Sequence, residues 1–272
     1  MNTVVTVVVD NIGDMGLAGE WGLCLLIEHD GKRILLDAGS SSLFLSNLKC
    51  LGFDVKDIDY GVLSHAHYDH GNGMPYFFEN NDKAKFFISD NANECCYHKR
   101  KFFRVYIGMP RGVLKKYEDR IIKVHGDYQI TDGVYLISHK TKGLDALGIR
   151  EKMYTRNHFK WSPDDFSHEQ SLVIETKNGL VIFNSCSHGG VENIINEVQA
   201  AFPDKNIYGY IGGLHLFNKT DEEILHVAQV FKDKNIQLIR TGHCTKNHAY
   251  KILKEQLGDK IEQFKVGLTI EL

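Results

Sequence analysis

The segment from residue 64 to residue 71 constrains this chain most, because it places four residues of metal-binding type within six positions. They are His65, His67, Asp69 and His70. A short apolar run precedes the segment and a glycine-rich turn follows it, so we predict a loop that leaves the end of a buried strand. Alternate residues of extended backbone face the same side, so His65 and His67 would point together, and the following pair can point at a second position nearby. Imidazole and carboxylate ligands suit zinc, iron or manganese, and the segment therefore predicts a metal site.

The composition is that of an ordinary soluble globular protein. The 272 residues are 43% hydrophobic and 25% charged, which is enough for one large core. The net charge of -3 argues against a general nucleic-acid binder. The first ten residues lack a basic region, and their apolar run is too short for a signal peptide or a membrane span. The six cysteines have no CxxC spacing, and because no export signal is seen we expect them to be reduced, in the cytoplasm. No membrane partner is expected.

Two similar hairpins are predicted, over residues 22–36 and 171–183. Asp30-Gly31 joins the arms of the first and Asn178-Gly179 those of the second. Each hairpin leads into a loop of small residues and then a helix-like stretch, at 43–51 and 191–202, which indicates a repeated ββα unit. Strands at 207–211 and 236–239 and a helix at 247–257 follow. Thr220 and Glu223 form a capping-box pattern that opens a further helix to about Lys232. This alternation predicts a layered α/β core.

The middle of the chain is less regular. We interpret residues 90–166 as an insertion over one end of a single domain that spans 1–272, with one hairpin near 121–137. The insertion carries Lys99, Arg100, Lys101 and Arg104 together with several aromatic residues. These residues favour an anionic, partly planar substrate, and an ordinary solvated surface is the alternative.

Later histidines also lie in loops. His188, His215 and His243 each follow an apolar strand, whereas His168 precedes one. Ligands grouped at strand ends along one sheet edge can form a folded metal site, so we expect His188 and His243 to bind metal. His168 and His215 are interpreted as metal or substrate contacts or as structural histidines. Cys186, like Cys244, flanks the site and is either a soft ligand or a small core residue.

Other polar residues near strand ends are candidates for supporting roles. Asp37 either accepts a hydrogen bond from a ligand imidazole or a loop amide, or is a plain turn residue before a glycine. Glu20, Asp10 and Asn11 are candidate substrate contacts at the same edge, and Arg104 is a further one in the insertion.

The chain resembles the metallo-β-lactamase superfamily of metal-dependent hydrolases. The features that carry the resemblance are the strand that ends in Asp37-Ala38-Gly39, the HxHxDH pattern at 65–70 and the later single histidines that end at His243. Five segments also resemble a narrower subfamily, labelled dihydropterin ribofuranosylaminobenzene-phosphate synthase-like. They are residues 20–23, 64–70, 186–188, 212–215 and 241–245.

The resemblance implies an α/β (α+β) fold, a four-layer αββα sandwich with a metal cleft along one edge. It implies that His65 and His67 bind a first ion with a third histidine, and that Asp69 and His70 bind a second ion with His243. Most relatives present a histidine and then an aspartate that bridges both ions. Here His168 and His188 have the corresponding separation, and no aspartate lies near Cys186. Either His188 takes the bridging position with His168 as the third ligand, or His188 is itself the third ligand. A neutral imidazole cannot bridge two cations as a carboxylate does, so we expect one or two ions.

We therefore expect a cytoplasmic, phosphoesterase-like hydrolase with one or two divalent ions, zinc being favoured over iron or manganese. A metal-bound water would attack a phosphoester or other anionic ester of a small molecule, and Asp69 would orient or deprotonate that water. A pterin-pathway transferase and a non-enzymatic metal or ligand sensor are the alternatives. A secreted β-lactamase is not expected, because no export signal is present.

Overall fold

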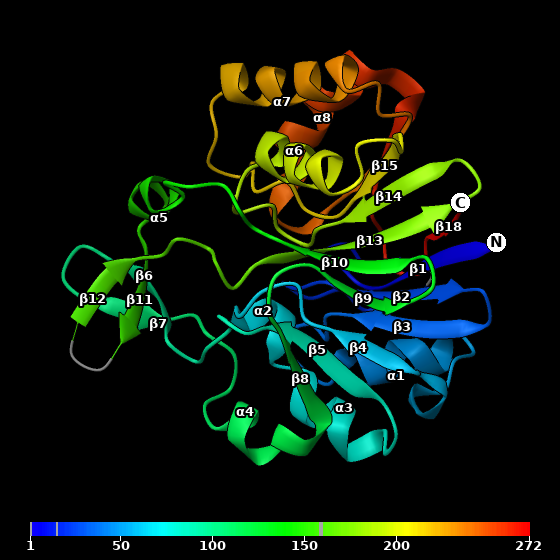
Figure 1. The fold of residues 1–272 in the computed structure, drawn as a ribbon, viewed down its shortest axis with the longest axis vertical. Coiled ribbons are helices and arrows are strands. Elements are labelled where there is room, and N and C mark those ends of the chain that lie inside the picture. The colour runs from blue at the N-terminus through cyan, green and yellow to red at the C-terminus, as the bar shows by residue number, and fades with distance from the viewer. Residues whose placement is uncertain (1, 15, 158–159) are drawn as a thin grey trace.

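Two seven-stranded sheets lie face to face, with helices on both outer faces, in the computed structural model of residues 2–14, 16–157 and 160–272 (Figure 1). This is the αββα sandwich that the resemblance to the superfamily implied, and it contains the layered α/β core that the sequence pattern predicted.

The first sheet contains the amino-terminal hairpin. Its strands are β1 (Thr3–Val9), β2 (Cys24–His29), β3 (Lys32–Leu36), β4 (Tyr60–Val62), β5 (Lys85–Ser89), β8 (Ile121–Val124) and β18 (Thr269–Glu271). They are arranged in the order β18-β1-β2-β3-β4-β5-β8. Asp30 and Gly31 both have positive φ, as a tight two-residue hairpin turn requires, so this predicted hairpin is confirmed. From β3 to β8 the neighbouring strands are parallel.

The second sheet contains the other predicted hairpin. Its strands are β9 (Tyr128–Thr131), β10 (Val134–Ser138), β13 (Gln170–Thr176), β14 (Gly179–Phe183), β15 (Ile207–Ile211), β16 (Leu238–Thr241) and β17 (Ile261–Gln263). Their order is β17-β16-β15-β14-β13-β10-β9, and β14 to β17 are parallel. Strand β13 pairs with β14 in the expected hairpin.

Helices cover the outer faces. The first sheet is covered by α1 (Leu43–Cys50) and α3 (Met74–Asn80), and the second by α6 (Val191–Ala201), α7 (Asp221–Asp233) and α8 (Lys246–Leu257) (Figure 1). The predicted capping box at Thr220 and Glu223 is formed and begins α7. The short helices are α2 (Tyr68–Gly71), α4 (Val113–Lys116), α5 (Asp145–Glu151), η1 (Val55–Asp57), η2 (Glu118–Arg120), η3 (His243–Thr245) and η4 (Gly258–Lys260).

The apolar core has three layers, because both faces of each seven-stranded sheet are buried. Residues such as Val7 and Phe183 fill the space between the sheets. Phe44 and Phe77 join α1 and α3 to the first sheet, and Phe231 belongs to the layer that joins α6, α7 and α8 to the second. Among the described residues, no helix is long and apolar enough to cross a membrane.

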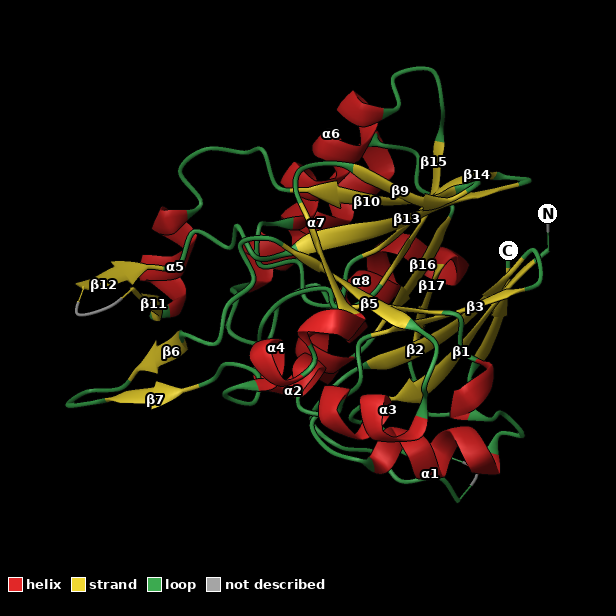
Figure 2. Cartoon of the chain, turned by 60° about the horizontal axis from the view of Figure 1, so that its bottom comes forward, coloured by secondary structure: helices red, strands yellow, loops and turns green. Residues whose placement is uncertain are grey.

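The expected insertion is smaller than residues 90–166. Within that range β8 belongs to the first sheet, and β9 and β10 belong to the second, because their apolar faces pair with core strands. The hairpin expected near 121–137 is formed by β9 and β10 alone. What lies outside the two sheets is a third sheet in the order β12-β11-β6-β7, which projects from one end together with α5 (Figure 2). Its strands are β6 (Cys96–Lys99), β7 (Arg104–Tyr106), β11 (Met153–Asn157) and β12 (Lys160–Pro163).

Candidate metal centre

The loops that follow β4 and β14 bring three imidazoles together. Ring nitrogens of His65, His67 and His188 lie within 4.8 Å of one another, and all three side chains are buried. The Nε2 atoms of His65 and His67 and both ring nitrogens of His188 have no hydrogen-bond partner among the described residues. A buried polar atom without a partner costs about 1–3 kcal/mol, so three imidazoles with such atoms around one point indicate a site for a cation.

The carboxylate of Asp37, at the end of β3, orients two of the histidines. Its Oδ1 accepts the backbone N–H of Ser64 at 2.7 Å, and its Oδ2 accepts the Ser64 hydroxyl at 2.7 Å and His70 Nδ1 at 2.7 Å. The Ser64 hydroxyl in turn lies 2.8 Å from His65 Nδ1. Because the Nδ1 atoms are held in this way, Nε2 is the nitrogen that His65 and His70 offer to a ligand.

A second set of donors lies beside the first. Asp69 Oδ2 is 3.3 Å from His243 Nε2 and 3.9 Å from His70 Nε2. The Cys186 thiol is 3.3 Å from His70 Nε2, and it is grouped both with His65 and His70 and with His243 and Cys244. The Cys186 thiol therefore lies between the two sets of donors. The sequence has no aspartate near Cys186 that could take this position.

The charge states in this cleft suit metal binding. Burial lowers the pKa of His67 to about 3 and holds the pKa of His65 and of His188 well below the ordinary value, so these imidazoles are neutral. Burial would raise the pKa of Asp69, but His70 and His243 outweigh it and hold that pKa below its usual range. Neutral imidazole and ionised carboxylate are the forms that bind a metal. Nitrogen, oxygen and sulfur donors in one place are the donor types that divalent transition metals use in proteins.

His168 has a different position from His188. Its Nδ1 accepts the backbone N–H of Ala66 at 3.1 Å, and its Nε2 lies 3.2 Å from Asp164 Oδ2 and 3.9 Å from the Cys96 thiol. His168 therefore holds the loop that carries His65 and His67. The geometry favours His188 as the third donor beside these two histidines.

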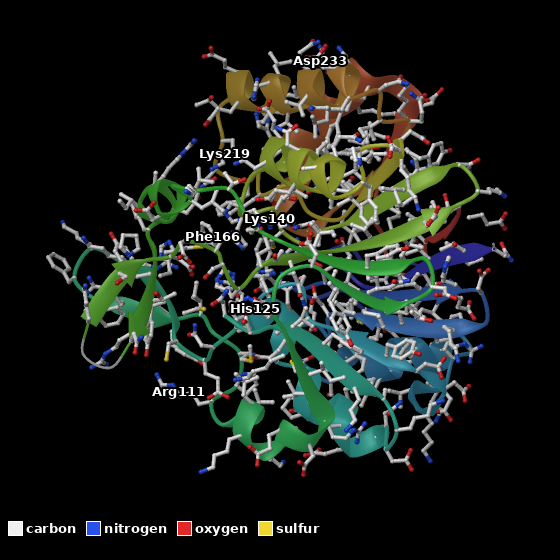
Figure 3. All side chains as sticks on the ribbon, viewed as in Figure 1. Arg111, His125, Lys140, Phe166, Lys219 and Asp233 are labelled. Carbon is white, nitrogen blue, oxygen red and sulfur yellow. The ribbon has the colours of Figure 1, made fainter. Side chains whose placement is uncertain are left out.

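Two residues that the sequence did not single out fix His188. Phe166 (labelled in Figure 3) lies before β13. Its ring stacks on the His188 ring with centroids 4.9 Å apart and planes 10° apart. Glu169 accepts the backbone N–H groups of His188 and Gly189, both at 2.9 Å. The only signal in the sequence was a glutamate directly after His168, nineteen positions from the residue whose amide it binds.

The expected substrate contacts of the first strands are placed differently. Asp10 is fully buried, and its Oδ1 accepts the backbone N–H of His243 at 2.8 Å. Asn11 donates to the His243 carbonyl at 2.8 Å. Glu20 accepts hydrogen bonds from the backbone and hydroxyl of Ser41. The polar atoms of these three residues hydrogen-bond to backbone groups and loop side chains, so these residues stabilise the loops of the site.

The third sheet forms one wall of a cleft of about 260 Å³ over the metal centre. Trp21, Asp69 and His243 line one side of the cleft, and Arg100 and Met153 line the other. Arg104, expected to contact substrate, is not among the described residues that line this cleft. Its guanidinium instead lies over the ring of Trp161, 4.3 Å from the centroid.

His215 also lines the cleft, so the structure brings it to the site. Its Nε2 is 3.5 Å from Glu151 Oε2, and neither ring nitrogen has a hydrogen-bond partner within the described part of the chain.

The loop before His215 packs tightly on the loop after β14. A Cβ on Gly212, whose φ is +142°, would lie 1.8 Å from the Asn184 carbonyl oxygen, so only glycine fits there.

Comparison with known proteins identifies the class. The family model described as the metallo-beta-lactamase superfamily matches residues 21–181, more than half of the chain, and the protein belongs to this superfamily of enzymes. A 7,8-dihydropterin-6-methyl-4-(beta-D-ribofuranosyl)-aminobenzene-5'-phosphate synthase of Methanocaldococcus jannaschii is 26% identical over 268 residues, covering 92% of this chain and 89% of the synthase. An uncharacterized protein of the same organism is 30% identical over 252 residues, covering 89% and 90%.

Solved structures agree with this assignment. A metal-dependent hydrolase of the beta-lactamase superfamily has a TM-score of 0.84 and 25% identity, with 99% of each chain covered. The metallo-beta-lactamase fold protein YhfI from Bacillus subtilis has a TM-score of 0.60 at 14% identity over the full length of both chains, which shows the fold alone. The superfamily and the synthase-like resemblance inferred from the sequence are thus confirmed.

Proposed function

We propose that the protein is a metal-dependent hydrolase of a phosphoester or another anionic ester of a small molecule. The observation that carries the proposal is the group of unpaired imidazole nitrogens on His65, His67 and His188, beside a second set of donors in a cleft. The hydrolase of similar structure supports the reaction class. All six cysteines are free, which agrees with a cytoplasmic protein.

The donors divide into two groups. His65, His67 and His188 would hold one divalent ion, zinc by preference, and Asp69, His70 and His243 would hold a second ion, with the Cys186 thiol between them. When bound, such ions supply Lewis acidity toward a substrate oxygen and lower the pKa of a water molecule.

The protein's own groups supply the rest of the mechanism. Asp69, ionised and lining the cleft, orients a water molecule and accepts its proton at a carboxylate oxygen. Arg100, on the opposite wall, attracts the anionic part of the substrate. Apolar side chains of the third sheet, such as Met153 and Val105, exclude bulk water from the reacting group.

The test combines metal analysis with a substrate screen. Protein purified without chelator should contain one to two equivalents of zinc, iron or manganese, and well under half an equivalent would contradict the site.

The metal-loaded protein should hydrolyse members of a panel of phosphodiesters, phosphomonoesters and thioesters. His67→Ala should lose this activity and keep its fold, because His67 contributes no apolar core contact. Wild-type rates in that variant would contradict the assignment.

A transferase of the pterin pathway is the second candidate, and the 26% identity to the synthase over 92% of this chain favours it. In that case a phosphorylated ribose derivative would be coupled to an acceptor. Turnover that requires the acceptor, with no hydrolysis in its absence, would decide for the transferase.

A further inference from the structure

We propose that the hairpin formed by β6 and β7 docks the protein on an anionic lipid surface, with Phe102 and Phe103 inserted among the lipids and basic side chains on the head groups. The observation that carries this inference is a pair of exposed phenylalanines within a cluster of cations at a projecting tip. The inference is independent of the proposed reaction. It replaces the sequence-based expectation that the protein has no membrane partner.

The hairpin holds the two phenylalanines at its turn. Lys99 on β6 lies opposite Arg104 on β7, and the N–H of Arg100 donates to the carbonyl of Phe103 at 2.7 Å, which closes the turn between the strands. Hairpin turns usually contain Gly, Asn or Asp, because these residues adopt the required backbone conformations and are well hydrated. Here Phe102 and Phe103 occupy the turn, and the requirements of the turn do not account for them.

The fold leaves both rings in water. Phe102 is 85% exposed and Phe103 is 63% exposed, the two highest values among the large apolar side chains of the described residues. The hairpin points away from both seven-stranded sheets, so neither sheet covers the two rings (Figure 2). A single exposed apolar side chain is ordinary, whereas adjacent ones surrounded by polar residues mark a surface that binds a partner or a membrane.

The charge around the two rings is positive. The described strands of the third sheet and the turn between β6 and β7 contain no acidic residue and six basic ones, which are Lys99, Arg100, Lys101, Arg104, Arg156 and Lys160. The whole chain has a net charge of -3, so positive charge is concentrated at this end of the molecule. The Lys101 ammonium lies 5.1 Å from the centroid of the Phe102 ring, so cation and apolar ring are presented together. Such a surface is complementary to acidic head groups.

A lipid surface fits this patch better than other anionic partners do. Aromatic rings enter the boundary between head groups and acyl chains, while the neighbouring cations stay with the phosphates. Single-stranded nucleic acid binds along a groove that follows its backbone, whereas these rings lie on a protruding turn. A symmetric contact between two copies of the tip would bring like charges together.

Co-sedimentation of the purified protein with vesicles tests the proposal. Vesicles of equimolar phosphatidylcholine and phosphatidylglycerol should bind the wild type at least about tenfold more tightly than vesicles of phosphatidylcholine alone, and added salt should weaken the binding. The double variant Phe102→Ser, Phe103→Ser should lower the affinity for the mixed vesicles at least about tenfold. The matched control is Tyr76→Ser, Leu225→Ser, on α3 and α7, whose side chains are each 43% exposed, and it should bind as the wild type does.

A second double variant measures the contribution of charge. Lys99→Gln, Lys101→Gln should also lower the affinity for the mixed vesicles at least about tenfold, because it removes two cations from the docking tip. Lys49→Gln, Lys251→Gln removes two exposed cations from α1 and α8 and should have no such effect. All four lysines and both phenylalanines are exposed, so the variants should fold normally, and thermal melting verifies this.

Tryptophan fluorescence reports on insertion itself. The emission of Phe102→Trp should shift to shorter wavelength when the mixed vesicles are added, because the new indole leaves water for the lipid boundary. Leu225→Trp on α7 is the control and should show no shift beyond that of the wild type.

Binding is measured without substrate, so this inference and the hydrolase proposal can fail separately. Equal affinity for the two vesicle compositions, or undiminished affinity in either hairpin double variant, would overturn the inference. Two other outcomes would also overturn it. One is binding to oligothymidylate with none to the vesicles, and the other is a dimer that Phe102→Ser, Phe103→Ser converts to a monomer, again with no vesicle binding.

Discussion

The carboxylate of Asp37 connects the groups that orient the metal-site loop. It accepts the backbone and hydroxyl hydrogens of Ser64 and lies 2.7 Å from His70 Nδ1. In Asp37→Asn the amide nitrogen replaces one acceptor, so one of these contacts is lost and the imidazole is free to rotate. We expect zinc affinity to fall about 10- to 100-fold, measured by chelator competition. The exposed Asp82→Asn is the matched control, and equal affinity in both variants would show that Asp37 does not position a ligand.

The different contacts of His168 and His188 give a second prediction at this scale. His188→Ala should lower the metal content, because it removes a direct donor. His168→Ala should retain the metal stoichiometry but reduce the free energy of unfolding by about 1–3 kcal/mol, because it leaves buried Asp164 and the Ala66 amide without a partner. Metal titration and urea denaturation of both variants provide the measurement. Loss of metal in His168→Ala with full content in His188→Ala would reverse the two roles.

Residue types near a metal site were readable from the sequence, whereas their partners were not. His65, His67 and His70 lie within one short HxHxDH pattern, so they could be identified as metal-binding candidates from the local sequence alone. The contacts of Glu169 and Phe166 with His188 join positions about twenty residues apart, and no local pattern encodes them. The prediction that Asp10 contacts substrate missed its hydrogen bond with the backbone amide of His243. That amide is 233 positions away, so no local pattern reveals the contact.

At the scale of elements, a buried ionic network joins β10, β13 and α6. His139, just after β10, lies 2.6 Å from Glu169 Oε2 and 2.8 Å from Glu197 Oε2, and Glu197 is on α6. Burial alone would lower the pKa of His139, but the two carboxylates raise it to about 9. The same contacts lower the pKa of Glu169 and bring the pKa of Glu197 to about 2.

The sign of the resulting pH dependence follows from these directions. The folded-state pKa of His139 lies above its ordinary value of 6.5, so its contribution to stability is complete below pH 6.5 and is lost as the pH rises through about 9. The free energy of unfolding of the wild type should therefore fall more between pH 6.5 and pH 9 than that of His139→Gln, measured by urea denaturation. His226→Gln, which removes an exposed ion pair with Glu192, is the control and should follow the wild type. Parallel pH profiles for wild type and His139→Gln would contradict the prediction.

Hairpins and helices were predictable because their signals are local. The turn at Asp30-Gly31 and the capping box at Thr220 each lie within a few residues of the contacts that they form. The extent of the insertion was not predictable, because β8 and β9 have the same short apolar pattern as strands of a separate module. Only their pairing partners, β5 in one sheet and β10 in the other, assign them to the core, and such pairings are long-range.

At the scale of the whole molecule, the third sheet projects from one end of the sandwich (Figure 2). Residues of this sheet line the cleft over the metal centre. Of its basic residues, Arg100 lines the cleft, whereas Lys101 lies over the ring of Phe102 at the exposed end of the β6–β7 hairpin. The sequence could not separate these two cations, because they are adjacent in the chain. In the fold, Arg100 is among the described residues that line the cleft, and Lys101 is not.

This difference predicts the effect of removing each charge. Arg100→Gln should raise KM for an anionic ester several-fold and leave kcat nearly unchanged, because the lost attraction acts on encounter and binding rather than on the reacting atoms. Lys101→Gln removes the same charge one position away and should change KM much less. Added salt should lower kcat/KM of the wild type, since exposed charges are screened over about 8–10 Å at physiological ionic strength, and it should lower kcat/KM of Arg100→Gln less. Equal KM values for the two variants, with a flat salt response, would show that this sheet covers the cleft without attracting the substrate.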